Sequence, residues 1–117
     1  MSSVRVFVHP DLPKEHVVIS FQFGSRNIFV EALDDDTLQV SSAMNNKDYI
    51  ELISDYSSPL LRAIGQPLRW VWTMTNNNGY FDGIQMEFAE SAKSDANIIQ
   101  LQVIASRIEY RLVTPID

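Results

Sequence analysis

Residues 68–88 read LRWVWTMTNNNGYFDGIQMEF, and this stretch decides the fold. Two runs rich in aromatic and β-branched residues flank the segment 76–79, which consists of three asparagines and a glycine. Strand-forming runs separated by a short Asn-Gly segment are typical of a β-hairpin. We therefore predict an antiparallel hairpin with strands over 68–75 and 80–88.

Two registers fit this hairpin, and they differ in where the tryptophans point. A two-residue turn at Asn78 and Gly79 mixes polar and apolar residues on each face, because its pairs are Trp72–Gln85 and Trp70–Glu87. A three-residue loop over 77–79, with Gly79 left-handed, gives the pairs Trp72–Ile84, Trp70–Met86 and Leu68–Phe88. The second register is preferred because it makes one face wholly apolar and sets Arg69 opposite Glu87. It predicts that both tryptophans are buried.

Alternating apolar residues predict a three-stranded meander over residues 16–42. A loop over 24–27 and a turn over 34–36 separate its strands. Together they predict the pairs Phe23–Ile28, Phe21–Val30, Ile19–Ala32, Ala32–Leu38 and Val30–Val40. Because a shift by one residue would turn these side chains to solvent, the agreement of two successive turns supports the arrangement.

The remaining segments give shorter signals. Residues 4–8 alternate as a first strand, and 48–53 favour a strand over one helical turn. Residues 58–65 have the capping pattern of a short helix, which would pack Leu60, Leu61 and Ile64. The alternation over 99–112 changes parity, which predicts a bulge or bend near 105–107. We predict an α+β fold that is mainly antiparallel sheet, a meander plus hairpins with one or two short helices, and a single domain over 1–117.

Composition narrows the classes of function. The 117 residues are 45% hydrophobic and 21% charged, which fits one packed domain. No secretory signal or membrane-length apolar run is visible, and the absence of cysteine fits the reducing cytoplasm. The formal charge is −6 and the basic residues are scattered, which disfavours nucleic-acid binding. We expect a cytoplasmic protein without nucleic-acid or membrane partners.

Candidate catalytic and metal-binding groups are few. His9 and His16 lack further ligands at metal-binding spacing, and the isolated glycines form no phosphate-binding loop. In the preferred register Asp82 lies on the same face as the core residues. We expect its carboxylate to accept hydrogen bonds from the amides of the turn, and we favour this over a catalytic role. Exposed Tyr80 and Phe81 beside the turn suit contacts with a protein partner. We expect no enzyme activity, no catalytic residue, no cofactor and no metal site.

Several segments resemble a family of small uncharacterised bacterial domains. They are residues 64–72 (IGQPLRWVW), 78–88 (NGYFDGIQMEF), 34–38 (DDDTL) and 105–108 (ASRI). Domains of this kind look similar to the immunity proteins that accompany toxins of contact-dependent and type VI secretion systems. The resemblance implies that the protein neutralises a cognate bacterial toxin by direct binding. It transfers no functional residue.

The leading hypothesis is a small acidic protein-binding domain, an immunity protein with a basic toxin domain as its partner. The expected partner-binding residues are Glu31, Asp34, Asp35, Asp36, Tyr80, Phe81 and Asp82. One alternative is a small ligand-binding domain or enzyme that uses the aromatic hairpin and Asp82. Another is a structural adaptor that assembles through an exposed sheet edge. The sequence leaves the oligomeric state and the activity of any toxin open.

Overall fold

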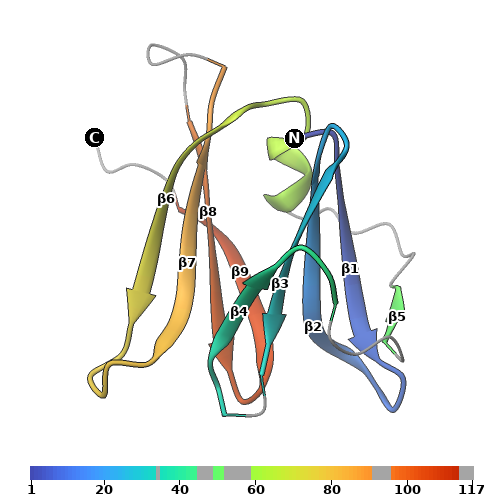
Figure 1. Cartoon of the computed structure of the whole chain (residues 1–117), viewed down its shortest axis with the longest axis vertical. Helices are drawn as coiled ribbons and strands as arrows, with labels where there is room; N and C mark the ends of the chain where they lie inside the picture. The colour runs from blue at the N-terminus through green and yellow to red at the C-terminus, as the bar shows by residue number, and fades with distance from the viewer. Residues whose placement is uncertain (34, 45–48, 52–58, 91–95, 114–117) are drawn as a thin grey trace.

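The computed structural model describes residues 1–33, 35–44, 49–51, 59–90 and 96–113, which form two antiparallel sheets packed face to face (Figure 1). The first sheet has the strand order β4-β3-β2-β1-β5, and the second has the order β6-β7-β8-β9. The strands are β1 (Ser3–His9), β2 (Leu12–Phe23), β3 (Arg26–Ala32), β4 (Leu38–Ser41), β5 (Ile50–Glu51), β6 (Leu68–Thr75), β7 (Phe81–Phe88), β8 (Asn97–Ile104) and β9 (Arg107–Val113). A short 3-10 helix, η1 (Pro59–Ala63), lies between β5 and β6 in the chain.

The main core fills the space between the two sheets. Alternate residues of each strand point inward, as expected for a pleated sheet with one buried face. The largest fully buried members of this core are Val6, Ile19, Phe21, Val30, Leu60, Phe88, Ile99 and Leu101. The rings of Phe23 and Phe88 stack across it with their centroids 6.4 Å apart. This core fixes which face of each sheet remains outside.

The outer face of the first sheet carries a second, smaller apolar cluster. Phe7, Val17 and Val18 are buried there, and half-buried Met44 and Tyr49 pack against them. A bulge in the β1–β2 register, where Val18 pairs with Phe7 but His16 pairs with Val8, adds Val17 to this face. Part of the outer face of the first sheet is therefore covered by the chain itself.

In the predicted meander the expected residues face the core, and some of the predicted residue pairs are formed. The pairs Val30–Val40 and Ala32–Leu38 are as expected. Between β2 and β3 the turn is tighter than predicted, because Phe23 pairs with Arg26 across Gly24 and Ser25. The shift is an even number of residues, so Phe21 still points inward, now opposite Ile28.

The β6–β7 hairpin has the predicted loop but not the predicted register. Gly79 is left-handed with φ 83°, and its N–H donates to the carbonyl of Asn76. Beyond the loop, Thr75 pairs with Phe81 but Met74 pairs with Gly83, so Asp82 is an extra residue in β7. Because of this bulge, residues 70–74 pair with β7 one residue away from the positions predicted by the three-residue loop. The register preferred from the sequence is therefore wrong.

The bulge reverses the predicted orientation of both tryptophans. Trp72 lies opposite Gln85 and Trp70 opposite Glu87 on the outer face. The two side chains are 44% and 60% exposed, respectively. A second irregularity between Leu68 and Trp70 returns Leu68 to its predicted place opposite Phe88. The predicted burial of Trp70 and Trp72 is therefore wrong.

The run over 99–112 is two strands joined by a turn, rather than one strand with a bulge or bend. Ile104 pairs with Arg107, and the turn residues Ala105 and Ser106 both have positive φ, at 52° and 61°. A two-residue turn of this type matches the twist of the strands it joins. It also explains the parity change seen in the sequence.

The prediction of a mainly antiparallel sheet is confirmed, whereas its α+β class is a loose fit because the described residues contain almost no helix. Within the described residues the only helical element is η1, whose three-residue period buries Leu60 and Ala63 on one face. Leu61 and Ile64, predicted to pack with Leu60, are exposed instead. The predicted strand over 48–53 is present at Ile50 and Glu51, and the rest of that range lies outside the described residues except for Tyr49.

Candidate binding surfaces

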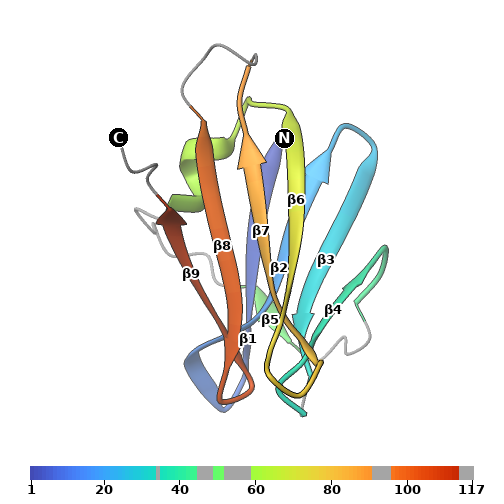
Figure 2. The same cartoon turned by 90° about the vertical axis from the view of Figure 1, so that its left-hand side faces the viewer.

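The turns that follow β1, β3, β6 and β8 gather at one end of the sandwich (Figures 1 and 2). We call this the turn end, and its described residues are Pro10, Asp11, Asp35, Asp36, Asn76–Tyr80, Ala105 and Ser106. Antiparallel connections alternate between the two ends of a sheet, which explains why these turns meet. The fold therefore brings together hairpin tips that are far apart in the chain.

The turn end holds part of the predicted acidic surface. Asp35 and Asp36 are exposed there, whereas Asp34 lies outside the described residues. Asp11, exposed in the β1–β2 turn, is a further carboxylate at this end that the sequence reasoning missed. The signal for it was its position directly after His9-Pro10, where the first strand was expected to stop.

Asp36 also has a structural role at the turn end. Its carboxylate accepts hydrogen bonds from the backbone N–H of Ser106 at 2.7 Å and from the Ser106 hydroxyl at 3.2 Å. Ser106 lies in the β8–β9 turn of the second sheet, so this contact joins the two sheets at their tips. The neighbouring carboxylate of Asp35 accepts from the N–H and the hydroxyl of Thr37 within its own turn.

The aromatic residues of the hairpin tip differ in exposure. Tyr80 is 58% exposed, and its N–H donates at 3.1 Å to Oδ1 of Asn76, which also accepts from Asn78. Phe81 is only half-buried and packs against the main core. The hydrogen-bonded loop thus exposes Tyr80 to solvent, whereas Phe81 is partly buried against the core.

Two predicted site residues have different surroundings from those expected. Glu31 is 3% exposed in the middle of β3, between its neighbours Val18 and Gln39. It therefore does not belong to a solvated acidic surface. Asp82 is the half-buried extra residue of the β7 bulge. The turn amides that were expected to bind it donate to Asn76 instead.

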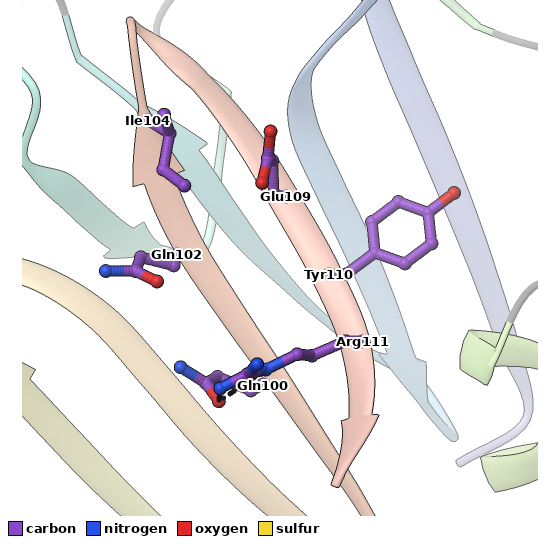
Figure 3. A pocket seen from close by; sticks show the side chains of 6 residues that line it. All are labelled: Gln100, Gln102, Ile104, Glu109, Tyr110 and Arg111. Atoms are coloured by element: carbon purple, nitrogen blue, oxygen red, sulfur yellow. Dashed lines mark hydrogen bonds between the residues drawn. The ribbon is translucent and has the colours of Figure 1, made fainter.

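The outer face of the second sheet is polar in the middle and aromatic at the β6 edge. A shallow pocket of about 240 Å³ lies over β8 and β9 (Figure 3). Its lining residues are Gln100, Gln102, Ile104, Glu109, Tyr110 and Arg111. Arg111 donates to Oε1 of Gln100 at 2.9 and 3.0 Å, while the Tyr110 ring points away from the pocket toward β2. The volume is below the range of about 300–1,000 Å³ usual for small-molecule sites.

Three ionisable groups outside the turn end, His16, Arg5 and Glu51, have shifted pKa values. His16 stacks on Tyr110 with ring centroids 5.4 Å apart, and partial burial lowers the pKa of its imidazole. Arg5 binds Glu51 through two hydrogen bonds of 2.8 and 2.9 Å, which lowers the pKa of the Glu51 carboxyl and raises that of Arg5. This pair fastens β5 to β1.

The described part of the chain contains no group of three histidine, aspartate or glutamate side chains placed to hold a metal ion. None of its helical residues forms a segment with the length and apolar character needed to span a bilayer.

Comparison with known proteins places the chain in a family. No curated protein and no solved structure matches it. Residues 2–117 match a family of unknown function (DUF6334). The match extends over nearly the whole sequence, including both sheets. The chain therefore belongs to this family of unknown function.

Proposed function

We propose that the protein is a non-catalytic binding domain that contacts a protein partner through the turn end. The supporting observation is that exposed carboxylates from two hairpins and an exposed tyrosine from a third lie at the same end of the sandwich (Figure 1). Asp11, Asp35 and Asp36 come from two turns of the first sheet, and Tyr80 comes from the second sheet. Carboxylates on a rim speed the encounter with a partner of opposite charge, and aromatic anchors slow its departure.

The form of this function that we propose is immunity in the cytoplasm against a bacterial toxin with a basic surface. Its support is the resemblance of the sequence to small acidic immunity domains, together with the net charge of −6. An acidic surface suits a partner that carries excess Lys and Arg, because complementary potentials favour association. Asp36 contributes charge while also holding the sheets together, and Glu31 takes no part.

The first test is biological. The chain is co-expressed with the toxin candidate encoded next to its gene, and cell growth is measured with and without it. Rescue of growth together with recovery of a stoichiometric complex supports immunity. Unchanged toxicity, with no complex on affinity capture, contradicts it.

The second test measures the association rate of the captured partner at several salt concentrations. We expect the double variant Asp11→Asn/Asp35→Asn to associate more slowly and with a weaker salt dependence, because it removes two charges from the turn end. Glu90→Gln is the control for the loss of one charge elsewhere, since Glu90 is exposed beyond the opposite end of β7. Equal effects per charge removed would mean that net charge, rather than the turn end, governs binding.

A further inference from the structure

The edge strand β6 exposes three large apolar side chains in succession. Trp70, Val71 and Trp72 are 60%, 45% and 44% exposed. β6 pairs with β7 along one side, and no described strand pairs with its other side. An eight-residue edge therefore presents unpaired backbone groups flanked by apolar surface.

The other three sheet edges are protected, and β6 is the exception. β4 has four residues and β5 has two, so neither offers a long template for pairing. β9 carries the charged residues Arg107, Glu109 and Arg111 on its outer face. Short strands and charged side chains are the usual means by which edges avoid association. β6 has neither.

The exposed residues of β6 point to both faces of the sheet. Trp70 and Trp72 lie on the outer face, and Val71, opposite Met86, lies on the inner face. A molecule resting on one face would cover only one of these sets. A strand placed alongside β6 would contact both sets at once, so the pattern fits strand addition.

The sequence of β6 is suited to pairing with itself. Residues 70–72 read WVW and are symmetric about Val71. If two copies pair antiparallel around this point, Val71 faces its own counterpart and Trp70 faces Trp72 of the second copy, twice. A two-fold interface requires this kind of self-complementary patch.

The distribution of charge also favours a second copy of the chain as the partner of β6. The chain carries a net charge of −6, so two copies repel each other over most surfaces. However, residues 56–81 contain no aspartate or glutamate. The only charged residue of β6 is Arg69, which would face neutral Thr73 of the second copy. The pairing strand thus brings no carboxylates together.

We propose that the protein forms a symmetric dimer in which β6 pairs antiparallel with β6 of a second copy, centred on Val71. The two four-stranded sheets become one continuous sheet, with the tryptophans of both copies side by side on its outer face. The proposal is independent of toxin binding, because it uses none of the turn-end carboxylates.

The test compares Val71→Lys with Val40→Lys by sedimentation equilibrium from micromolar to millimolar concentration. Val40 is the matched control, because it is 44% exposed on β4, an edge strand of the other sheet. We expect the mass of the wild type and of Val40→Lys to rise with concentration toward twice the 13.3 kDa mass of one chain. We expect Val71→Lys to be monomeric with an unchanged circular dichroism spectrum, because it sets two lysines opposite each other. A monomeric wild type over this range, including the case in which β6 pairs only with another protein, overturns the proposal.

A cross-link provides a second measurement that does not depend on tolerance of lysine. The chain has no cysteine, so Val71→Cys introduces a single thiol that would face its counterpart across the two-fold axis. Directly opposed residues of paired strands lie within reach of a disulfide. We expect mild oxidation to link Val71→Cys and to leave Val40→Cys unlinked. Equal cross-linking of the two variants would count against this register.

Intrinsic fluorescence gives a third readout. Both tryptophans of the chain lie in β6, so their emission reports on this strand alone. Dilution of the wild type should shift the emission to the red as the tryptophans become more exposed, and Val71→Lys should show the shifted spectrum at every concentration. A spectrum that is independent of concentration while the mass changes would show that the dimer forms elsewhere.

Discussion

The carboxylate of Asp36 joins the two sheets by accepting hydrogen bonds from the N–H and the hydroxyl of Ser106, 70 residues further along the chain. Asp36 itself is left-handed, with φ 61°, a conformation that aspartate and asparagine tolerate better than most residues. The residue therefore combines an acceptor for the neighbouring turn with a backbone conformation that its own turn needs.

The contribution of Asp36 to stability can be separated into these two parts. We expect Asp36→Ala to lower the free energy of unfolding by about 1–2 kcal/mol, since it loses both the acceptor and the tolerance of positive φ. Asp36→Gly should cost less, because glycine adopts this φ without strain. Asp36→Asn should be nearly neutral. Urea unfolding measures the series, and equal losses for all three variants would contradict the role of the Ser106 contact.

Gly79 should be sensitive to substitution for conformational reasons alone. Its φ is 83°, yet a Cβ added to it would meet no atom within 4 Å. We expect Gly79→Val to destabilise the fold by about 1–2 kcal/mol through backbone strain, and Gly79→Asn to cost clearly less. Thermal unfolding of the two variants makes the comparison. No loss of stability in the valine variant would show that the loop has another conformation.

The exposure of Trp72 predicts a small effect of its removal on folding. Phe88 is fully buried and stacks on Phe23, so Phe88→Ala should cost about 3–5 kcal/mol. Trp72→Ala, at 44% exposure, should cost less than half as much. Denaturant unfolding of each variant is compared at low protein concentration, where any dimer is dissociated. A loss in Trp72→Ala as large as that in Phe88→Ala would favour the buried register instead.

His16 predicts a dependence of stability on pH. Burial lowers the pKa of His16 in the folded state, so the unfolded state binds the proton more readily. The free energy of unfolding is therefore highest above about pH 6.5, the ordinary pKa of histidine. It decreases as the pH drops through that value toward the lower pKa of the folded state. We expect His16→Asn to flatten this part of the profile. NMR titration of the His16 ring gives the folded pKa directly, and a value at or above 6.5 would refute the prediction.

The hairpin that dominates the sequence shows where pattern reasoning succeeds and where it fails. The loop follows from the asparagines and Gly79, because few residues accept a left-handed conformation. The register depends on the extra residue Asp82, which no alternation reveals. The available signal was Gly83, since a glycine inside a strand often marks a bulge or a close approach. In the structure a Cβ at Gly83 would lie 3.1 Å from the sulfur of Met74.

Two other differences between prediction and structure have different causes, one in a turn and one in tertiary packing. The parity change near residue 105 signalled an irregularity, but Ala105 and Ser106 are unusual for a turn with two positive φ angles, so a bulge was the simpler expectation. Glu31 has the parity of an outward-facing residue in β3. Its burial depends on tertiary packing at the outer face of the first sheet, which periodicity does not describe. The turn end, in contrast, follows from antiparallel connectivity once the strands are known.

Each sheet is drawn from one half of the chain, because the strands of the first lie between residues 3 and 51 and those of the second between residues 68 and 113. Most strand pairing within a sheet therefore closes short loops, which is fast, whereas docking of the sheets brings distant residues together and is entropically slower. We expect hairpins such as β6–β7 to form early and the contact between Phe23 and Phe88 to form late in folding. Substitutions of core residues at the interface between the sheets should then mainly accelerate unfolding. The lifetime of the native state is therefore controlled by the packing of one sheet on the other.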